Sequence, residues 1–364
     1  MYLCMRLLRI QTPLPRAAAL IASLAYMFGG VFIAHIGNLK LIAVAAWLPL
    51  VFLALHQAIM AGDRKTGIGC ASIGGVLLGI GTLAGHGQMT FLLAAYLGFY
   101  ALFRAISERS FWPFAALLIL GITAAGLAAI NLLPSLEAVQ YSVRAEFDAR
   151  RATGYALPWR GLLGLFAPDF YGRGQVRFWG DWPRVEYGYV GVMTLILAGV
   201  AVVTDRTRLT RFFALSALLF TLLALGDNTP LYPLLVRLVP AFPFQVPARF
   251  VLLLDFSLAG LAAIGLAQLM ERPRAMRAYL IGAALLTTAV LSLLIWQYRA
   301  SIENVMQHQQ QMRLAIGLFA LFAVWSWLLI WARSVDRMPA KTCGVLAGRL
   351  LGVDVIALGW YVEL

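Results

Sequence analysis

The sequence has 364 residues, of which 62% are hydrophobic and only 12% charged, with a mean hydropathy of +0.82 and a net charge of +13. These values exclude an ordinary soluble globular domain. The basic residues are spread over short segments between apolar runs, without the basic aromatic platform of a nucleic-acid binder, so we expect no nucleic-acid partner. We predict an all-α, polytopic integral membrane protein.

About eleven apolar runs are long enough to cross a hydrocarbon layer of ~30 Å as helices of ~20 residues. They lie at 17–35, 39–60, 66–84, 88–103, 111–133, 187–204, 210–226, 248–270, 278–297, 312–332 and 343–362. Their hydrophobicity is continuous, which excludes the alternating strands of an outer-membrane barrel and leaves helices. We predict about five spans in residues 1–134, a long extracytoplasmic loop at 135–186, and about six spans in 187–364.

The distribution of arginine and lysine predicts the orientation in the membrane. With a cytoplasmic N-terminus, the inner segments hold 16 basic residues and the outer segments five, once the loop at 136–186 is set aside. Long loops cross a membrane largely regardless of their charge, and short inner loops are enriched in basic residues. We therefore predict a membrane protein with a cytoplasmic N-terminus whose long loop lies outside.

The first long outer segment, 136–186, combines seven arginines with several acids and aromatics. If residues 135–145 continue as a helix, Glu137, Tyr141 and Arg144 share one face and form a polar group at the membrane edge. The alternative is an amphipathic turn whose side chains only snorkel to the headgroups.

The second outer segment, GDNTPLYPLLVRLVPAFPFQVPARF, has five prolines within eighteen residues. Proline removes backbone donors, so we expect a broken, re-entrant or extended stretch here. Arg249 follows at the start of the next span, where its guanidinium is suited to hold a phosphate through two parallel hydrogen bonds. The alternative is an interfacial anchor that only orients the helix.

Several other polar residues lie at or within the spans. His35 and His86 close short outer turns, where they either bind substrate or serve as turn residues; two histidines without a firm third ligand do not predict a metal site. The three cysteines predict neither a disulfide nor a metal cluster. Asp255 and Asp354 fall inside spans, which indicates either function or a buried partner. We expect no metal and no cofactor.

Seven blocks carry a family resemblance. They are IASLAYMFGGVFIAHIGNLKLIAVAAWLPLVFLAL, LAGHGQMTFLLAAYLGFYALFR, INLLPSLEAVQYSVR, APDFYG, YGYVGV, LALGDNTPLY and VPARF, in this order. Together they resemble the bacterial YfhO family of membrane proteins, which is similar to the class C polytopic glycosyltransferases. The resemblance implies a GT-C-like architecture and a role with polyprenyl-phosphate sugars at the outer face. It also implies a first span with an acidic catalytic loop and a terminal outer domain, so we expect a chain shortened at both ends.

Sugar transfer from a lipid phosphate needs a base near the acceptor and cations near the leaving phosphate. Asp169, in the turn of APDFYG, and Glu137 are the candidate catalytic carboxylates; a turn residue and an ion pair with Arg144 are their structural alternatives. The candidate substrate-binding residues are Arg144, Arg249, Arg177, Tyr141, His35 and His86. The expected partners are a polyprenyl-phosphate-linked sugar and membrane lipid.

Three functions remain open at this point. The first is a glycosyltransferase-like membrane protein that acts on a polyprenyl-linked sugar at the outer face. The second is a non-catalytic lipid-linked-sugar transporter, or an accessory subunit of cell-envelope glycosylation. The third, an ion or small-solute transporter, would need paired broken helices or several buried acids, for which the sequence offers little.

Overall fold

The computed structural model describes residues 1–8, 15–141, 155–168, 170–172, 188–238, 246–301 and 309–359, and its regular elements in these ranges are all helices. The α-helices of the first half are α1 (Tyr2–Leu7), α2 (Arg16–Met27), α3 (Gly30–Ala34), α4 (Leu39–Ala45), α5 (Leu48–Met60), α6 (Arg64–Thr82), α7 (Gly87–Glu108) and α8 (Trp112–Gln140). Those of the second half are α10 (Val192–Thr204), α11 (Arg208–Ala224), α12 (Leu231–Leu238), α13 (Val251–Glu271), α14 (Arg277–Ser301), α15 (Gln309–Ser334) and α16 (Ala340–Gly359). Short 3-10 helices are η1 (Trp159–Leu165), η2 (Gly226–Asn228), η3 (Pro247–Phe250) and η4 (Pro273–Met276).

Each of the eleven predicted apolar ranges contains a helix, which confirms the all-helical membrane fold. Seven stretches are long and apolar enough to cross a membrane: Arg16–Ala34, Leu39–Met60, Gly87–Glu108, Trp112–Ser135, Pro247–Glu271, Tyr279–Ala300 and Gln309–Ser334. The helices at 66–84, 187–204, 210–226 and 343–362 do not meet that measure over the described residues. The predicted number of eleven spans is therefore not confirmed.

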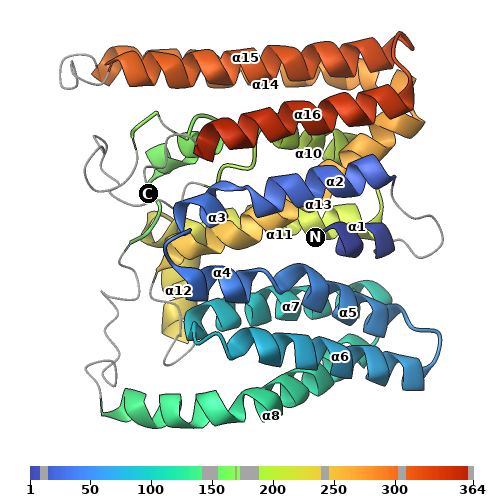
Figure 1. Cartoon of the computed structure of the whole chain (residues 1–364), viewed down its shortest axis with the longest axis vertical. Coiled ribbons are helices and arrows are strands. Elements are labelled where there is room, and N and C mark those ends of the chain that lie inside the picture. Colours follow the sequence, from blue (N-terminus) through green and yellow to red (C-terminus); the bar gives the residue numbers. More distant parts are fainter. Residues whose placement is uncertain are drawn as a thin grey trace.

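The helices run side by side, and the chain reverses at two opposite ends of the molecule (Figure 1). Connections 61–63, 109–111, 205–207, 272–276 and 335–339 lie at what we call the basic end, and these are segments predicted to face inward. Connections 35–38 and 83–86 lie at the opposite end with the described residues between α8 and α10 and between α11 and α13, which we call the loop end. The segments predicted as inner and as outer thus separate in space, while the side of the membrane that each end faces remains a prediction.

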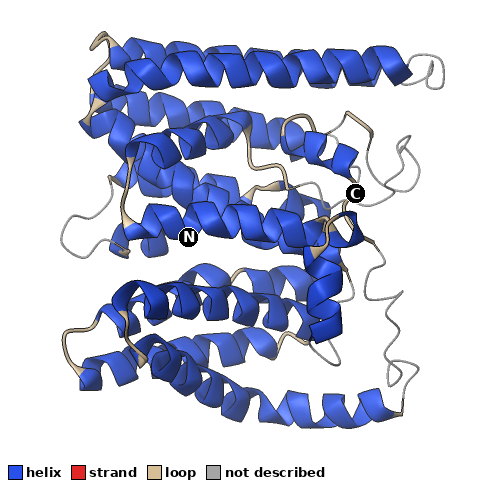
Figure 2. Ribbon diagram, turned by 180° about the vertical axis from the view of Figure 1, so that it is seen from behind, coloured by secondary structure: helices blue, strands red, loops and turns tan. Residues whose placement is uncertain are grey.

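Helix α13 forms the centre of the molecule. It packs on α10, α11, α2 and α16, and 94% of its span is buried inside the protein. Phe256 of α13 joins Phe52, Tyr96 and Phe212 in an aromatic cluster with ring centroids 5.3–5.8 Å apart. Only 22% of the α8 span and 6% of the α14 span are buried. These helices lie at opposite edges of the molecule (Figure 2). The hydrophobic surface of these edge helices is suited to lipid contact.

Two predicted spans are broken helices rather than continuous ones. The first is interrupted between α2 and α3, where Gly29 is extended with φ −64° and ψ 159°. The second is interrupted at Trp47, the N-cap of α5, two residues before Pro49 in the first turn of that helix. Conversely, α8 continues through Pro134 to Gln140, beyond the predicted span at 111–133. Proline removes one helical hydrogen bond and its ring crowds the carbonyl four residues earlier, but membrane helices tolerate proline where the freed backbone groups find other partners.

Candidate functional site

Segments from distant parts of the chain meet at the loop end. The Gly30 N–H, where α3 begins, donates to the Tyr189 carbonyl at 2.6 Å. The Leu157 N–H donates to the Ala224 carbonyl at 2.9 Å, and the Ala248 N–H donates to the Tyr155 carbonyl at 3.4 Å. Leu157 of the first predicted outer segment therefore contacts the end of α11, and Tyr155 and Ala248 join the described parts of the two outer segments.

A basic group forms at this end from α3, α4, α7 and η3, and we call His35, Lys40, His86 and Arg249 the loop-end cluster. Arg249 follows Pro247 in η3 and donates a hydrogen bond to the side-chain oxygen of Gln88. His86 stands at the N-cap of α7, and His35 ends α3, where its Nδ1 lies 2.9 Å from the carbonyl oxygen of Val31. The cluster brings together three of the six predicted substrate-binding residues.

Basic groups dominate the electrostatics around His86. Burial lowers the pKa of His86, and the positive charges of Arg249, His35 and Lys40 lower it further. The three groups that act on this ring are all basic. Its Nδ1 accepts from the Met89 N–H at 3.3 Å, so the neutral ring carries its proton on Nε2. His86 can therefore donate a hydrogen bond in the same region as the Arg249 guanidinium.

Two further polar atoms beside the cluster lack a protein partner among the described residues. The Gln88 Nε2 and the Thr90 Oγ1 are both buried without a hydrogen bond. A buried donor without a partner costs ~1–3 kcal/mol, so such groups indicate a ligand, a water or a functional requirement. Gln88 and Lys40 were not predicted from sequence. The signal available was weak: one polar side chain in the first turn of an apolar helix and one lysine just inside a span.

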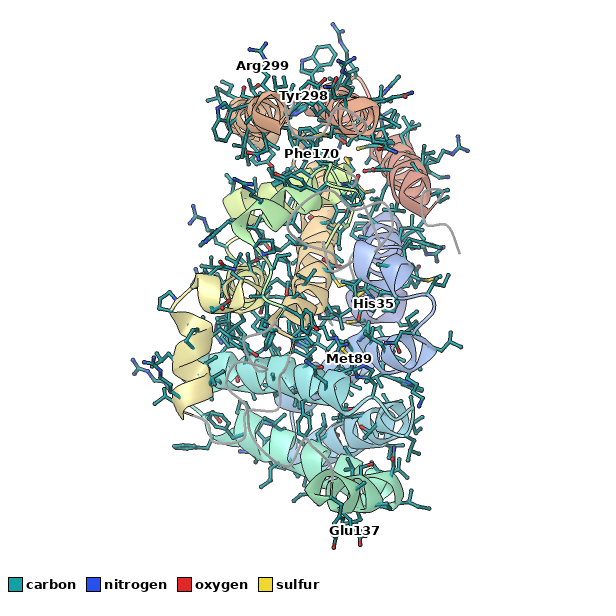
Figure 3. The ribbon with its side chains drawn as sticks, turned by 90° about the vertical axis from the view of Figure 1, so that its left-hand side faces the viewer. His35, Met89, Glu137, Phe170, Tyr298 and Arg299 are labelled. Atoms are coloured by element: carbon teal, nitrogen blue, oxygen red, sulfur yellow. The ribbon has the colours of Figure 1, made fainter. Side chains whose placement is uncertain are left out.

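The other predicted site residues lie elsewhere. Figure 3 shows Glu137 at the far edge of the molecule, with its side chain pointing away from the body that contains His35. Glu137 and Tyr141, at the end of α8, are both solvent- or lipid-exposed, and Tyr141 is 85% exposed. Asp169, Arg144 and Arg177 lie outside the described residues. The structure does not bring Glu137 and the loop-end cluster together.

The two buried aspartates have identifiable partners. Asp255 accepts from the backbone N–H of Val31, in the first turn of α3, while its Oδ1 is buried without a hydrogen-bond partner among the described residues. Asp354 accepts from the Val192 N–H, at the first residue of α10, at 2.8 Å, and from the Tyr189 hydroxyl. Each carboxylate thus satisfies donors at the start of a helix that begins inside the protein, where the helix dipole favours negative charge. Of the two meanings predicted for these residues, a buried partner is the one observed.

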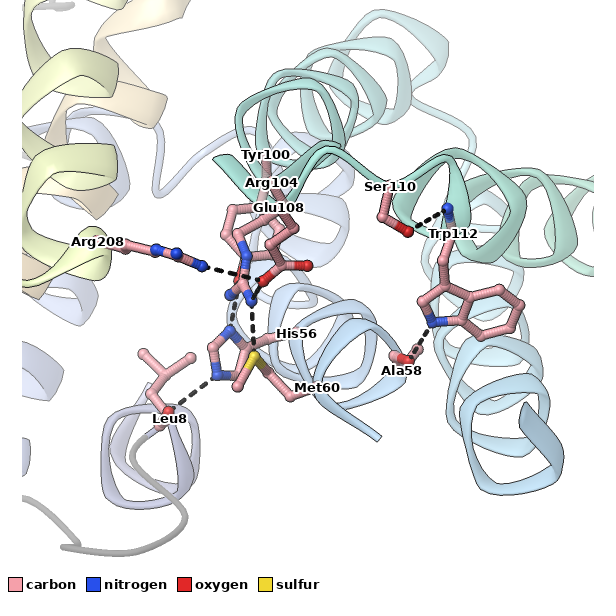
Figure 4. A network of polar contacts seen from close by, with 10 residues as sticks. All are labelled: Leu8, His56, Ala58, Met60, Tyr100, Arg104, Glu108, Ser110, Trp112 and Arg208. Atoms are coloured by element: carbon pink, nitrogen blue, oxygen red, sulfur yellow. Dashed lines mark hydrogen bonds and ion pairs between the residues drawn. The ribbon is translucent and has the colours of Figure 1, made fainter. Parts of the chain in front are cut away.

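A second polar network lies toward the basic end and links α1, α5, α7 and α11 (Figure 4). His56 bonds the Leu8 carbonyl through Nε2 at 2.9 Å and the Tyr100 hydroxyl through Nδ1. Arg104 donates to that hydroxyl and to Glu108, and Arg208 lies 3.7 Å from the same carboxylate. Glu108 interacts with both arginines, and both nitrogens of His56 are hydrogen-bonded. We therefore interpret this network as a structural connection between four helices.

Among the described residues, no three histidine, cysteine, aspartate or glutamate side chains come together as a potential metal site. The loop-end cluster and its neighbour Gln88 offer donors and cations: the Arg249 guanidinium, the His86 Nε2–H and the Gln88 amide. Such groups bind phosphates and other oxyanions through charge-assisted hydrogen bonds.

Comparison with known proteins gives a family and no individual relative. No curated protein and no solved structure matches the chain. The family model described as bacterial membrane protein YfhO matches residues 1–346, which is nearly the whole chain. With its apolar helices, this match indicates a membrane location. The chain belongs to the YfhO family of bacterial membrane proteins.

Proposed function

We propose that this protein binds a polyprenyl-phosphate-linked sugar at the loop end, on the outer face of the bacterial cytoplasmic membrane, and takes part in transferring the sugar to a glycan or lipid acceptor. The observation that carries the proposal is the convergence of His35, His86 and Arg249, from three separate helical segments, beside the buried and unpartnered amide nitrogen of Gln88. An anionic phosphate satisfies both the accumulated positive charge and the buried donor.

The roles of the residues follow from their chemistry. Arg249 offers two parallel N–H donors to the phosphate, and His86, neutral because its pKa is lowered, donates from Nε2. Lys40 is exposed and adds charge without a fixed geometry. The polyprenyl chain stays in the bilayer, which the exposed apolar surfaces of the helices allow.

A transfer reaction also needs a base for the acceptor hydroxyl. Asp169 is the first candidate because its sequence, between Pro168 and Gly172 in APDFYG, is that of a tight turn suited to hold a carboxylate. Glu137 is the second candidate, and its exposed position at the end of α8 suits it only to an acceptor that approaches from that edge.

The alternative is a non-catalytic carrier or accessory subunit of cell-envelope glycosylation. The distance in the fold between Glu137 and the loop-end cluster favours this alternative, because an all-basic cluster binds a phosphate without any base beside it. The two functions share the binding step and differ only in whether a glycosidic bond is made.

The binding step is tested with the full chain in detergent and a polyprenyl phosphate as the probe. Loss of one charge-assisted contact is worth ~1.5–3 kcal/mol, so Arg249→Gln should weaken binding by about 10- to 150-fold. Arg249→Lys keeps the positive charge but not the pair of parallel donors, so its affinity should lie between those of the wild type and Arg249→Gln. Arg237→Gln, an exposed arginine of α12 at the same end, is the matched control and should bind normally. Equal affinities for Arg249→Gln and Arg237→Gln would refute the proposed site.

The transfer step is tested in vesicles that contain the same protein, a polyprenyl-phosphate sugar and candidate acceptors. If the protein is a transferase that uses Asp169, Asp169→Asn should bind the lipid phosphate and abolish transfer. Binding by the intact chain with no transfer to any acceptor would favour the carrier or accessory function.

A further inference from the structure

A long apolar groove lies between α15 and α16, remote from the loop-end cluster. Its volume is about 730 Å³, and its wall includes Trp325 and Trp331 of α15 and Leu346 and Val353 of α16. The volume falls in the ~300–1,000 Å³ range of ligand pockets. Along α15 the lining runs from residue 318 to 332, about 21 Å of helix at ~1.5 Å per residue, which exceeds the ~15 Å depth of one hydrocarbon leaflet.

One charged residue, Arg349, interrupts the apolar wall. It lies in the middle of α16, is exposed, and makes no hydrogen bond or ion pair within the described part of the chain. If α16 spans the membrane, as the apolar run at 343–362 predicts, Arg349 lies where an unpaired charge costs ~2.5–3.5 kcal/mol on insertion scales, and it calls for a partner. Because side chains on a helix tilt toward its N-terminus, Arg349 leans toward the basic end.

The mouth of the groove at the basic end is also positive. The Arg337 guanidinium carbon lies 5.3 Å from the ring centroid of Trp331, which itself lines the groove, and Lys341 at the start of α16 is exposed. The acid of this corner, Asp336, is engaged by Arg274 at 3.1 Å and Arg333 at 3.4 Å. Positive charge therefore predominates where the groove reaches the membrane surface.

We propose that this groove binds an anionic phospholipid from the leaflet at the basic end, with one acyl chain along the apolar wall and the phosphate held by Arg349 and Arg337. Charge selects the lipid class: a zwitterionic headgroup brings its own cation to the arginines, whereas phosphatidylglycerol does not. Basic pockets between membrane helices on the cytoplasmic side are suited to such headgroups. The site is separate from the proposed sugar-phosphate site, and neither depends on the other.

The position of two tryptophans in the groove provides a direct readout. The full chain is placed in phosphatidylcholine vesicles that contain a small fraction of either brominated phosphatidylglycerol or brominated phosphatidylcholine, because bromine on the acyl chain quenches nearby tryptophan fluorescence. Subtracting the signal of the Trp325→Phe/Trp331→Phe double variant isolates the groove from the protein's other tryptophans. We expect the groove tryptophans to be quenched at a lower fraction of brominated phosphatidylglycerol than of brominated phosphatidylcholine.

Arginine and groove variants complete the test. One basic group near the membrane surface is worth ~1 kcal/mol, so Arg349→Gln should reduce the preference for phosphatidylglycerol about fivefold. Lys65→Gln removes an exposed cation of the same end on α6 and should leave the preference unchanged. Val353→Phe should lower quenching by both lipids because it fills the groove, whereas Val345→Phe, at an exposed position of α16 outside the groove, should not.

Quenching by brominated phosphatidylcholine and thermal unfolding report whether Arg349→Gln is folded. Equal quenching of wild-type groove tryptophans by the two lipids would show ordinary lipid contact and overturn the proposal. A folded Arg349→Gln variant that keeps the full preference would overturn it as well.

Discussion

The close approach of α13 to α10 at Gly265 provides the sharpest test of the packing. Gly265 of α13 faces the backbone of α10, and a Cβ added there would overlap the Leu197 carbonyl oxygen and lie 2.8 Å from the Leu197 carbonyl carbon and 3.3 Å from the Ala201 nitrogen. All three obstacles are backbone atoms, which cannot rotate away as a side chain does. Gly265→Ala therefore forces α10 and α13 apart.

The magnitude follows from two opposing contributions. Overpacking of a well-packed core costs ~1–3 kcal/mol, and we take the upper end because the contact is backbone on backbone along the most extensive helix pair in the protein. Replacing glycine by alanine inside a helix returns up to ~1 kcal/mol of helix propensity. The expected net loss is about 2 kcal/mol. Gly317→Ala on α15, where an added Cβ meets nothing within 4 Å, should gain up to about 1 kcal/mol from propensity alone.

The assay is unfolding of each purified variant in mixed detergent micelles, followed by circular dichroism, with the wild-type chain in the same micelles. The free energy of unfolding should be lower than that of the wild type for Gly265→Ala and higher for Gly317→Ala, and the two variants should differ by about 3 kcal/mol. If Gly265→Ala were as stable as Gly317→Ala, the reasoning about the contact between α10 and α13 would be wrong.

Three further predictions concern polar groups. Asp354→Ala leaves two buried donors without an acceptor and should lower the free energy of unfolding by roughly 2–6 kcal/mol, at ~1–3 kcal/mol for each donor. Asp354→Asn keeps one acceptor and should lower it clearly less in the same unfolding assay, so equal losses would contradict the capping role. Because the pKa of His86 is lowered in the folded state, the unfolded chain binds more protons as the pH drops below ~6.5, and stability should fall there. His86→Asn keeps an N-cap acceptor and should show a smaller fall in thermal stability over the same pH range. An identical pH dependence of the variant and the wild type would argue against the neutral ring. Tyr100→Phe removes the hydroxyl between His56 and Arg104 and should destabilise the protein by ~1–3 kcal/mol. Tyr96→Phe should destabilise it less, because its partner Ser257 keeps a second hydrogen bond. The reverse order in thermal unfolding would contradict the structural role given to Tyr100.

The sequence predicts the fold class and the two ends well, because length, hydropathy and the spacing of basic residues act locally along the chain. It does not predict which helix is central. The spans of α13 and α14 have mean hydropathies of 2.2 and 2.0, yet 94% of the first and 6% of the second are buried. Lipid and apolar side chains are equivalent surroundings for an apolar helix, so hydropathy carries no information about which of them it contacts.

The site shows the same division. His35, His86 and Arg249 are recognisable because a polar side chain at the outer end of an apolar run is unusual by itself. Their convergence is not recognisable, since the order of the helices in space depends on shape fit between residues far apart in sequence. The carboxylate of Asp354, which meets the start of α10 from 162 residues away, is a clear example.

The enclosed position of α13 has a consequence for how the chain assembles. Helices α2, α10 and α11 are synthesised before α13, but α16, which covers another of its flanks, is synthesised after it. Until α16 is inserted, one face of α13 contacts lipid acyl chains, which its high hydropathy allows. The later packing of α16 on that face depends on shape complementarity. A chain in which α16 does not pack on α13 would consequently remain in the bilayer instead of aggregating. Membrane proteases would recognise it by the unpacked α16.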